Sequence, residues 1–175
     1  IAMRDAGIKK IILQWSQYEY TRFYPTPNNS DKFDVMETIF NFADENDMEV
    51  YAGTYFAESW WRHWDDQFWL VNIALRSRRT IEAVWNKYSQ HPSFVGWYIP
   101  FESSDADFDD WEIASLNYLY KTIALLAKEQ SKKRSDATPA NVKVLMSTFF
   151  THATPVKTVT ENFKAILKDV KVDQV

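Results

Sequence analysis

Four apolar runs alternate along the chain with segments whose apolar residues recur at helical spacing. Continuous runs of this kind are typical of strands covered on both faces, and they occupy residues 8–15, 48–56, 94–101 and 142–149. Apolar positions three and four residues apart predict helices, here over residues 34–45, 67–90, 109–129 and 154–170. We therefore expect an α/β fold in which buried strands and helices alternate.

Both ends of the chain read as parts of further elements. Residues 1–6 have the pattern of a last helical turn, and Gly7 stands where a left-handed cap is wanted. Residues 169–175 leave a helix and begin to look like a fifth strand. We interpret residues 1–175 as one partial domain, a fragment that is truncated at both ends.

Strict alternation of strand and helix predicts parallel βαβ units. The strands recur about every 40 residues, which suits a (β/α)8 TIM barrel with insertions, and four units make about half of one. A doubly wound open sheet is the alternative. The long loops favour the barrel, because most follow strand ends, where barrel enzymes place their catalytic face; they cover residues 16–33, 57–66, 102–108 and 150–154. The connection at residues 130–141 breaks this asymmetry.

Composition and charge exclude several classes of protein. The net charge is −4 with both signs mixed along the chain, which argues against a nucleic-acid-binding surface. The chain has no cysteine, so a disulfide framework and a thiolate site are excluded. Three glycines are too few for a phosphate-binding loop, and no apolar run approaches the roughly 20 residues that span a membrane.

The sequence shows no metal or cofactor pattern. His63, His91 and His152 are scattered, without the spacing of metal ligands. The acidic stretch at residues 105–110 lacks the glycine and the final glutamate of an EF-hand loop, so we read it as helix capping by Asp107 or Asp109. We therefore expect neither a metal nor a cofactor.

The strand at residues 94–101 ends in a carboxylate, Glu102. If parallel strands direct their carboxyl ends to one face, Glu102 lies where a barrel displays its chemistry. Capping of the next helix, or pairing with a cation, is the alternative role. The same reasoning brings other strand-end residues to this face: Gln14, Ser16, Tyr55, Glu58, Tyr98, Ser147 and Phe149.

Glycoside hydrolysis needs a second carboxyl group, about 5 Å from the first for retention and roughly 6.5–9.5 Å for inversion. Glu58 follows the preceding strand and is the first candidate, ahead of Glu19; a solvent-exposed loop glutamate is the alternative interpretation. Trp60 and Trp61 could stack on a sugar ring or cover the barrel rim. Hydrogen bonds to sugar hydroxyls could come from Gln14, Tyr18, Tyr55 and Tyr98, with Phe149 as a further contact.

Several segments resemble a bacterial barrel family, the domain of unknown function DUF4434, which is regarded as glycoside-hydrolase-like. The resemblance covers most of the chain and is carried by AGIKKIILQWSQYEY, the Phe23-Tyr24-Pro25-Thr26-Pro27 loop, VYAGTYF, HPSFVGWYIPFE and VLMSTFF. It implies that the four strands are the second to fifth of a barrel. Glu102 then ends the fourth strand, where the large retaining glycoside-hydrolase clan carries its acid/base glutamate.

The chain departs from the clan at one position, because Phe101 stands where the clan usually has Asn. The clan's nucleophile lies on a seventh strand, which this chain does not contain.

Our first hypothesis is a carbohydrate-directed hydrolase with Glu102 as general acid/base, and the alternative is a non-catalytic glycan-binding barrel protein. Either way the partner is a carbohydrate, and the resemblance implies an exported protein, periplasmic or on the cell surface.

Overall fold

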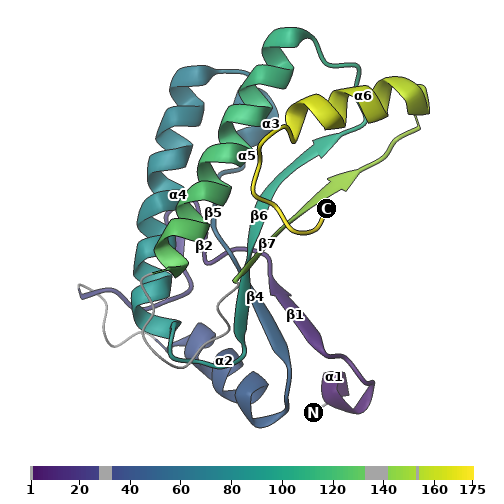
Figure 1. The fold of residues 1–175 in the computed structure, drawn as a ribbon. Coiled ribbons are helices and arrows are strands. Elements are labelled where there is room, and N and C mark those ends of the chain that lie inside the picture. Colours follow the sequence, from purple (N-terminus) through teal and green to yellow (C-terminus); the bar gives the residue numbers. More distant parts are fainter. Residues whose placement is uncertain (1, 28–32, 133–141, 153) are drawn as a thin grey trace.

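Four parallel strands form the main sheet of the computed structural model, which describes residues 2–27, 33–132, 142–152 and 154–175 (Figure 1). In spatial order they are β1 (Lys10–Leu13), β4 (Glu49–Gly53), β6 (Phe94–Ser104) and β7 (Lys143–Phe149). A second, small sheet contains β2 (Gln17–Tyr18), β3 (Thr21–Arg22) and β5 (Tyr55–Phe56).

Three helices, α2, α4 and α5, begin after an aspartate that caps them. The side chains of Asp34, Asp66 and Asp109 each accept a hydrogen bond from a backbone N–H in the first turn of the helix that follows. Asp109 does so within a complete capping box. The helices are α1 (Ala2–Asp5), α2 (Val35–Glu45), α3 (Trp60–His63), α4 (Gln67–Tyr88), α5 (Asp110–Ser131) and α6 (Val156–Ile166).

Neighbouring strands in the main sheet belong to successive βα units of the sequence. β1 pairs with β4, β4 with β6, and β6 with β7. A doubly wound sheet reverses its strand order at a switch point, whereas a barrel wall continues in one direction. A parallel bridge from Gln174 to Leu145 extends the row past β7. The order is therefore consistent with a stretch of barrel wall, and the barrel itself stays a prediction.

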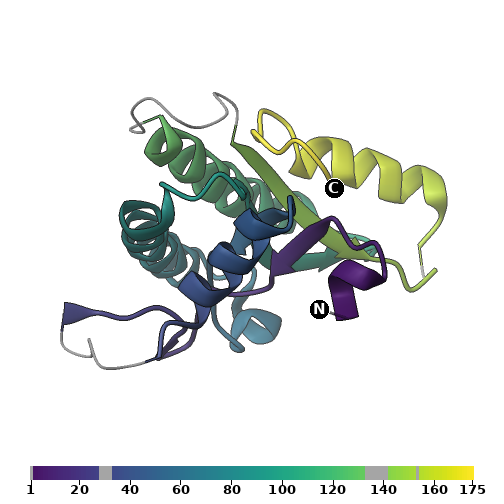
Figure 2. The same ribbon diagram turned by 90° about the horizontal axis from the view of Figure 1, so that it is seen from below.

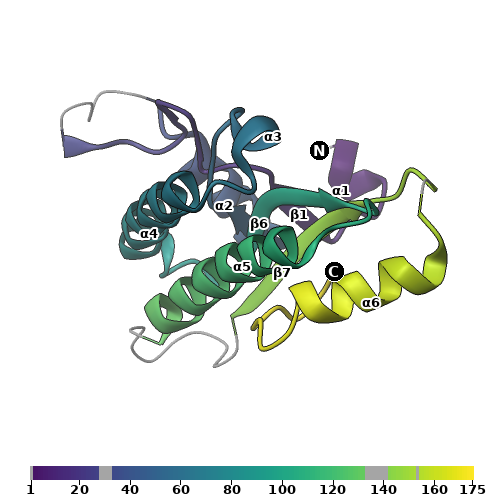
Figure 3. The same ribbon diagram turned by 90° about the horizontal axis from the view of Figure 1, so that it is seen from above.

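Four helices, α2, α4, α5 and α6, cover one face of this sheet. Seen from above, α4, α5 and α6 follow one another along one side of it (Figure 3). Seen from below, α2 lies between α4 and β1 (Figure 2), where Phe40 stacks on Tyr88 with ring centroids 5.3 Å apart. Strand residues that face the helices join one large buried core with them: Val50, Ala52, Trp97, Ile99, Val144 and Met146.

The opposite face of the sheet, which we name the inner face, carries its own cluster. Tyr51, Tyr98 and Leu145 are buried there, and they alternate along their strands with the residues that face the helices. Gly96 lets this cluster form, because a Cβ at that position would overlap the Tyr51 ring. The expected barrel would enclose this face.

Several element boundaries differ from the sequence-based expectation. Residues 48–56 form two strands rather than one, since the chain changes sheet at Thr54. Residues 57–66, expected to be a loop, contain α3. Pro155, and not Thr154, caps α6, which ends at Ile166 rather than near residue 170. Gly7 has a φ of 78°, as its predicted capping role requires.

The change that matters for function concerns β6. This strand continues to Ser104, because Ser103 and Ser104 pair with Thr148 and Phe149 of β7. Glu102 therefore lies inside the strand, two residues before its end, and not past its tip as expected. Of the expected loop at 16–33 and the connection at 130–141, residues 28–32 and 133–141 lie outside the described part of the chain.

Candidate functional site

Three side chains from β6 and β7 meet near the carboxyl ends of these strands. The Ser147 hydroxyl donates to Glu102 Oε1 at 2.8 Å, and the Tyr98 hydroxyl lies 2.5 Å from Ser147 Oγ. Tyr98 also reaches Glu102 Oε1 directly, at 3.4 Å. Tyr98 belongs to the inner-face cluster, so these contacts fix the Glu102 carboxylate at that side of the sheet.

Two buried aromatic side chains hold the backbone around Glu102. The Trp60 indole N–H donates to the Glu102 carbonyl at 3.0 Å, and the Tyr120 hydroxyl donates to the Phe101 carbonyl at 2.9 Å. Both donors come from helices, α3 and α5. The position of the carboxylate is therefore set by the strand pairing and by two further hydrogen bonds.

Trp60 and Trp61 have different surroundings. Trp60 is only 2% exposed and packs against Phe101 and Trp69, so it is a core residue and offers no open ring face to a ligand. Trp61 is 48% exposed. Its ring lies edge-on to Phe149, with centroids 6.0 Å apart. Of the two tryptophans expected to stack on a sugar, the structure leaves Trp61 available.

Glu102 is one of the residues that line a hollow of about 270 Å³, which we name the Glu102 hollow. Aromatic rings make up much of its wall, and those that frame it are Trp60, Trp61, Trp64, Phe108 and Phe149. Among the described residues, no cation forms an ion pair with Glu102. The arrangement combines a carboxylate with apolar flat surfaces, which can bind a ring-shaped polar ligand.

Burial raises the pKa of Tyr98, the first residue of this network. The hydrogen bond with Ser147 acts in the opposite direction, and the negative charge of Glu102 adds to the increase. Burial likewise raises the pKa of Tyr120. Both phenols therefore stay protonated through the neutral pH range and remain donors.

Glu58 lies in a separate hydrogen-bonded group. The Tyr18 hydroxyl donates to Glu58 Oε2 at 2.6 Å, and the Glu58 backbone N–H donates to Glu19 Oε1 at 2.7 Å. The hydrogen bond to Glu58 raises the pKa of Tyr18. Within the described residues no hydrogen bond joins this group to Glu102, so the pairing of Glu58 with Glu102 stays a prediction.

The remaining expected ligand contacts are divided between the two sides of the sheet. Gln14 follows β1 and is exposed. Tyr55 belongs to the core that faces the helices, where Arg76 of α4 lies 5.5 Å from its ring centroid and donates to its hydroxyl at 3.4 Å. Tyr55 was expected at the cleft, but the change of sheet at Thr54 turns it toward α4.

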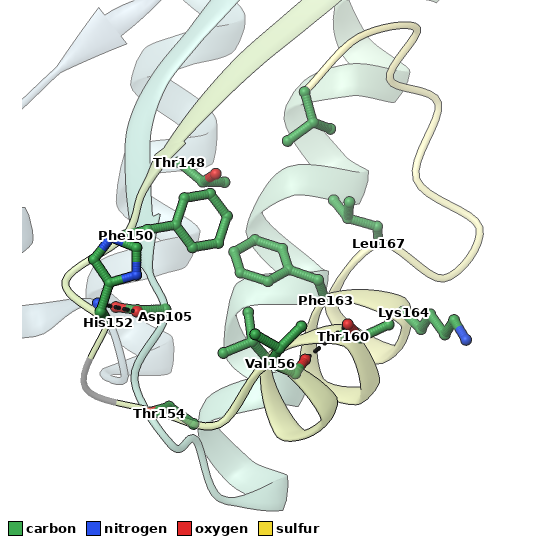
Figure 4. Close-up of a pocket in the computed structure, with 12 residues that line it drawn as sticks. Asp105, Thr148, Phe150, His152, Thr154, Val156, Thr160, Phe163, Lys164 and Leu167 are labelled. Atoms are coloured by element: carbon green, nitrogen blue, oxygen red, sulfur yellow. Dashed lines mark hydrogen bonds between the residues drawn. The ribbon is translucent and has the colours of Figure 1, made fainter.

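Sequence reasoning did not identify the role of Asp105. This buried carboxylate accepts three hydrogen bonds from the turn after β7: from the Thr151 N–H at 2.8 Å, the Thr151 hydroxyl at 2.7 Å and the His152 N–H at 2.8 Å. Figure 4 shows Asp105 beside His152. These hydrogen bonds, led by that from the Thr151 backbone, lower the pKa of Asp105. Asp105 thus holds the turn in which His152 takes a φ of 61°.

Phe108 was also missed as a wall of the Glu102 hollow, whereas the stretch from Trp60 to Trp64 was expected to supply a stacking wall. The signal for Phe108 was a single aromatic residue within the acidic stretch at residues 105–110, which we interpreted as helix capping. Its ring packs edge-on against Trp64, with centroids 5.4 Å apart. An aromatic residue isolated among acidic ones can therefore mark a buried contact.

A larger hollow, of about 570 Å³, lies between β7 and α6. Figure 4 shows Phe150 and Phe163 facing each other across it. Thr148 and Phe150 line it, and they alternate along the chain with Ser147 and Phe149, which belong to the Glu102 network and hollow. This apolar space is thus on the helix side of the sheet edge, away from the carboxylate, and we do not assign the chemistry to it.

Two further features of the described residues bear on ligands and location. They contain no group of three or more His, Cys, Asp or Glu side chains placed to hold a metal ion. None of the helices in this part of the chain has both the length and the apolar composition needed to cross a membrane.

Comparison with known proteins gives the family. The model of the domain of unknown function DUF4434 matches residues 1–175, so the chain belongs to that family, as its sequence segments indicated. No curated protein matches the chain significantly.

A solved structure shares the fold. It is the crystal structure, at 1.80 Å, of a "putative alpha-L-fucosidase" from Bacteroides thetaiotaomicron VPI-5482, with a TM-score of 0.73 and 21% identity. The match covers 98% of this chain and 53% of that one. At this identity the likeness shows the fold alone, and our chain spans about half the length of that protein.

Proposed function

We propose that this member of the DUF4434 family is a glycoside hydrolase in which Glu102 is the general acid/base. One observation carries the proposal: Glu102 lies near the carboxyl end of a parallel strand, lines an aromatic hollow, and has no cation partner among the described residues. Carboxylates in this position perform the chemistry in many barrel enzymes.

In the proposed mechanism, Glu102 protonates the glycosidic oxygen as the bond to the sugar breaks. It then accepts a proton from the water molecule that completes the reaction. The exposed Trp61 ring and Phe149 beside it would contact the apolar face of the sugar. Gln14, just after β1, and Tyr18 of β2 would supply hydrogen bonds.

Glu58 is the proposed second carboxylate of this chain. The Tyr18 hydroxyl donates to its Oε2 at 2.6 Å and so fixes the position of the carboxylate, as a nucleophile or a base requires. If it has this role, Glu58→Gln will reduce kcat as severely as Glu102→Gln. A role in binding alone will raise KM and leave kcat nearly unchanged.

The direct test compares the protein with its Glu102→Gln variant on a panel of glycosides. The panel begins with α-L-fucosides, because the structural neighbour carries that activity in its name, and continues with other terminal and internal linkages. We expect at least a hundredfold loss of kcat, the usual scale for a general acid/base. Glu45→Gln is the matched control, since Glu45 is exposed on α2. Equal turnover by the Glu102→Gln variant would remove Glu102 from the mechanism.

A non-catalytic glycan-binding protein is the second candidate. It is favoured by the different hydrogen-bond partners of the two carboxylates, since Glu58 bonds to Tyr18 while Glu102 bonds to Ser147. In this case Glu102→Gln will leave glycan affinity nearly intact, and Trp61→Ala will weaken it by removing the exposed ring. Calorimetric titration of both variants separates the two functions.

A further inference from the structure

We infer that Tyr98 and Ser147 form a directed chain of hydrogen bonds that ends on Glu102 Oε1 and leaves Oε2 to carry the transferable proton. The inference rests on the proposed function of Glu102 and goes one step further. Ser147 and Tyr98 are then positioning residues, since they act through Glu102 and not on the substrate.

The direction of the chain follows from counting hydrogens. An ionised carboxylate can only accept, so the single Ser147 hydroxyl hydrogen is used in the 2.8 Å contact with Glu102 Oε1. The 2.5 Å contact between Ser147 Oγ and the Tyr98 oxygen needs a second hydrogen, and only Tyr98 can supply it. The 3.4 Å contact from Tyr98 to Glu102 is the longer and weaker one.

The surroundings keep this order fixed. Tyr98 is 6% exposed, and its burial keeps the phenol protonated. The phenols whose pKa values respond to the charge of Glu102 are Tyr98 on β6 and Tyr120 on α5, and both are neutral near pH 7. Ser147 of β7 is uncharged at every pH. No titration near neutral pH in these three groups therefore reverses the chain.

The two oxygens of Glu102 are consequently different. Oε1 receives the contacts from Ser147 and Tyr98, whereas no described residue donates to Oε2. A proton on Oε1 would displace the Ser147 hydrogen bond, so the acid form carries its proton on Oε2. A carboxyl group that is held by one oxygen and transfers the proton through the other is oriented before the substrate binds.

The experiment follows the ionisation of Glu102 by NMR of its side-chain carboxyl carbon, with the resonance assigned by its absence in Glu102→Gln. Ser147→Ala removes the donor to the ionised form, so the midpoint of the titration should rise by about one pH unit. Ser147→Thr retains a hydroxyl and should restore most of the difference. Thr148→Ala, on the opposite face of the same strand, is the matched control and should leave the midpoint unchanged.

Tyr98→Phe tests the order of the chain. Ser147 still donates to Glu102 in this variant, so the rise should be smaller than in Ser147→Ala. An unchanged midpoint in Ser147→Ala, or a larger rise in Tyr98→Phe than in Ser147→Ala, would overturn the inference. For an active enzyme, Ser147→Ala should also reduce kcat more than it changes KM and move the alkaline limb of the pH–rate profile upward.

The NMR titration does not require a substrate, so failure of the two proposals can be told apart. A raised midpoint in Ser147→Ala together with full activity of Glu102→Gln would support the hydrogen-bond chain and reject the hydrolase mechanism. A catalytically essential Glu102 with an unchanged midpoint in Ser147→Ala would do the reverse.

Discussion

The burial of Trp60 makes a quantitative prediction about the substitution Trp60→Phe. The indole N–H is the donor to the Glu102 carbonyl, and the ring packs against Phe101 with centroids 5.2 Å apart. Phenylalanine keeps an aromatic ring in the core but has no N–H and a smaller volume. The substitution therefore removes one hydrogen bond and leaves a small void.

The expected loss of stability can be worked out from these two changes. A buried carbonyl that loses its donor costs about 1–3 kcal/mol, and the void adds on the order of 1 kcal/mol. The free energy of unfolding should thus fall by about 2–4 kcal/mol in Trp60→Phe. For a domain of this size the melting temperature should drop by about 5–15 °C.

Urea unfolding followed by circular dichroism measures this change. Trp61→Phe is the matched control, because the neighbouring tryptophan is 48% exposed, and its unfolding free energy should change by less than about 0.5 kcal/mol. Glycan binding should show the opposite pattern, with the larger effect in Trp61→Phe. If Trp60→Phe is as stable as the unsubstituted protein, Trp60 does not act as a buried clamp on β6.

Two further predictions concern the core and the pH dependence of stability. Gly96→Ala places a methyl group against the Tyr51 ring and should lower the unfolding free energy by about 1–3 kcal/mol; an unchanged urea midpoint would show that the ring moves freely aside. Burial acts to raise the pKa of Asp44, but hydrogen bonds from Ser93 and His91 outweigh it and leave that pKa below its ordinary value. The stabilisation from Asp44 is therefore fully present above about pH 4 and is lost as the pH falls through the lower, folded-state pKa. The stability gap between the protein and Asp44→Asn should shrink between pH 7 and pH 2 in urea titrations, and a constant gap would contradict this.

Local chemistry made much of the fold predictable from the sequence. Asp109 was one of the two expected caps of its helix, and it starts α5 as expected. Gly7 has the expected left-handed conformation. These features depend on residues within a few positions of one another, which a sequence displays directly.

Features set by distant pairing could not be read in the same way. The extension of β6 past Glu102 depends on hydrogen bonds to Thr148 and Phe149 of β7, and nothing in the polar segment after residue 101 signals them. The turning of Tyr55 toward α4 depends on the change of sheet at Thr54. A one-residue change of phase moves a strand side chain to the other face.

The candidate site was predictable in outline and not in detail. The rule that parallel strands share one catalytic end brought Tyr98, Glu102 and Ser147 together on paper, and hydrogen bonds join them in the structure. The rule could not tell which of Trp60 and Trp61 is buried and which is exposed. The difference follows from the four-residue helix α3, which places the Trp60 ring in the core and leaves the Trp61 ring exposed.

The clamping of β6 by Trp60 and Tyr120 has a consequence for the diversification of this family. A carboxylate anchored in a strand keeps its position when the loop residues around it are substituted. A library randomised at residue 61 and at 149–152 should therefore yield variants that accept different ligands around an unmoved acid. Such tolerance would mean that new ligand specificities arise from substitutions at these loop positions and not at Glu102.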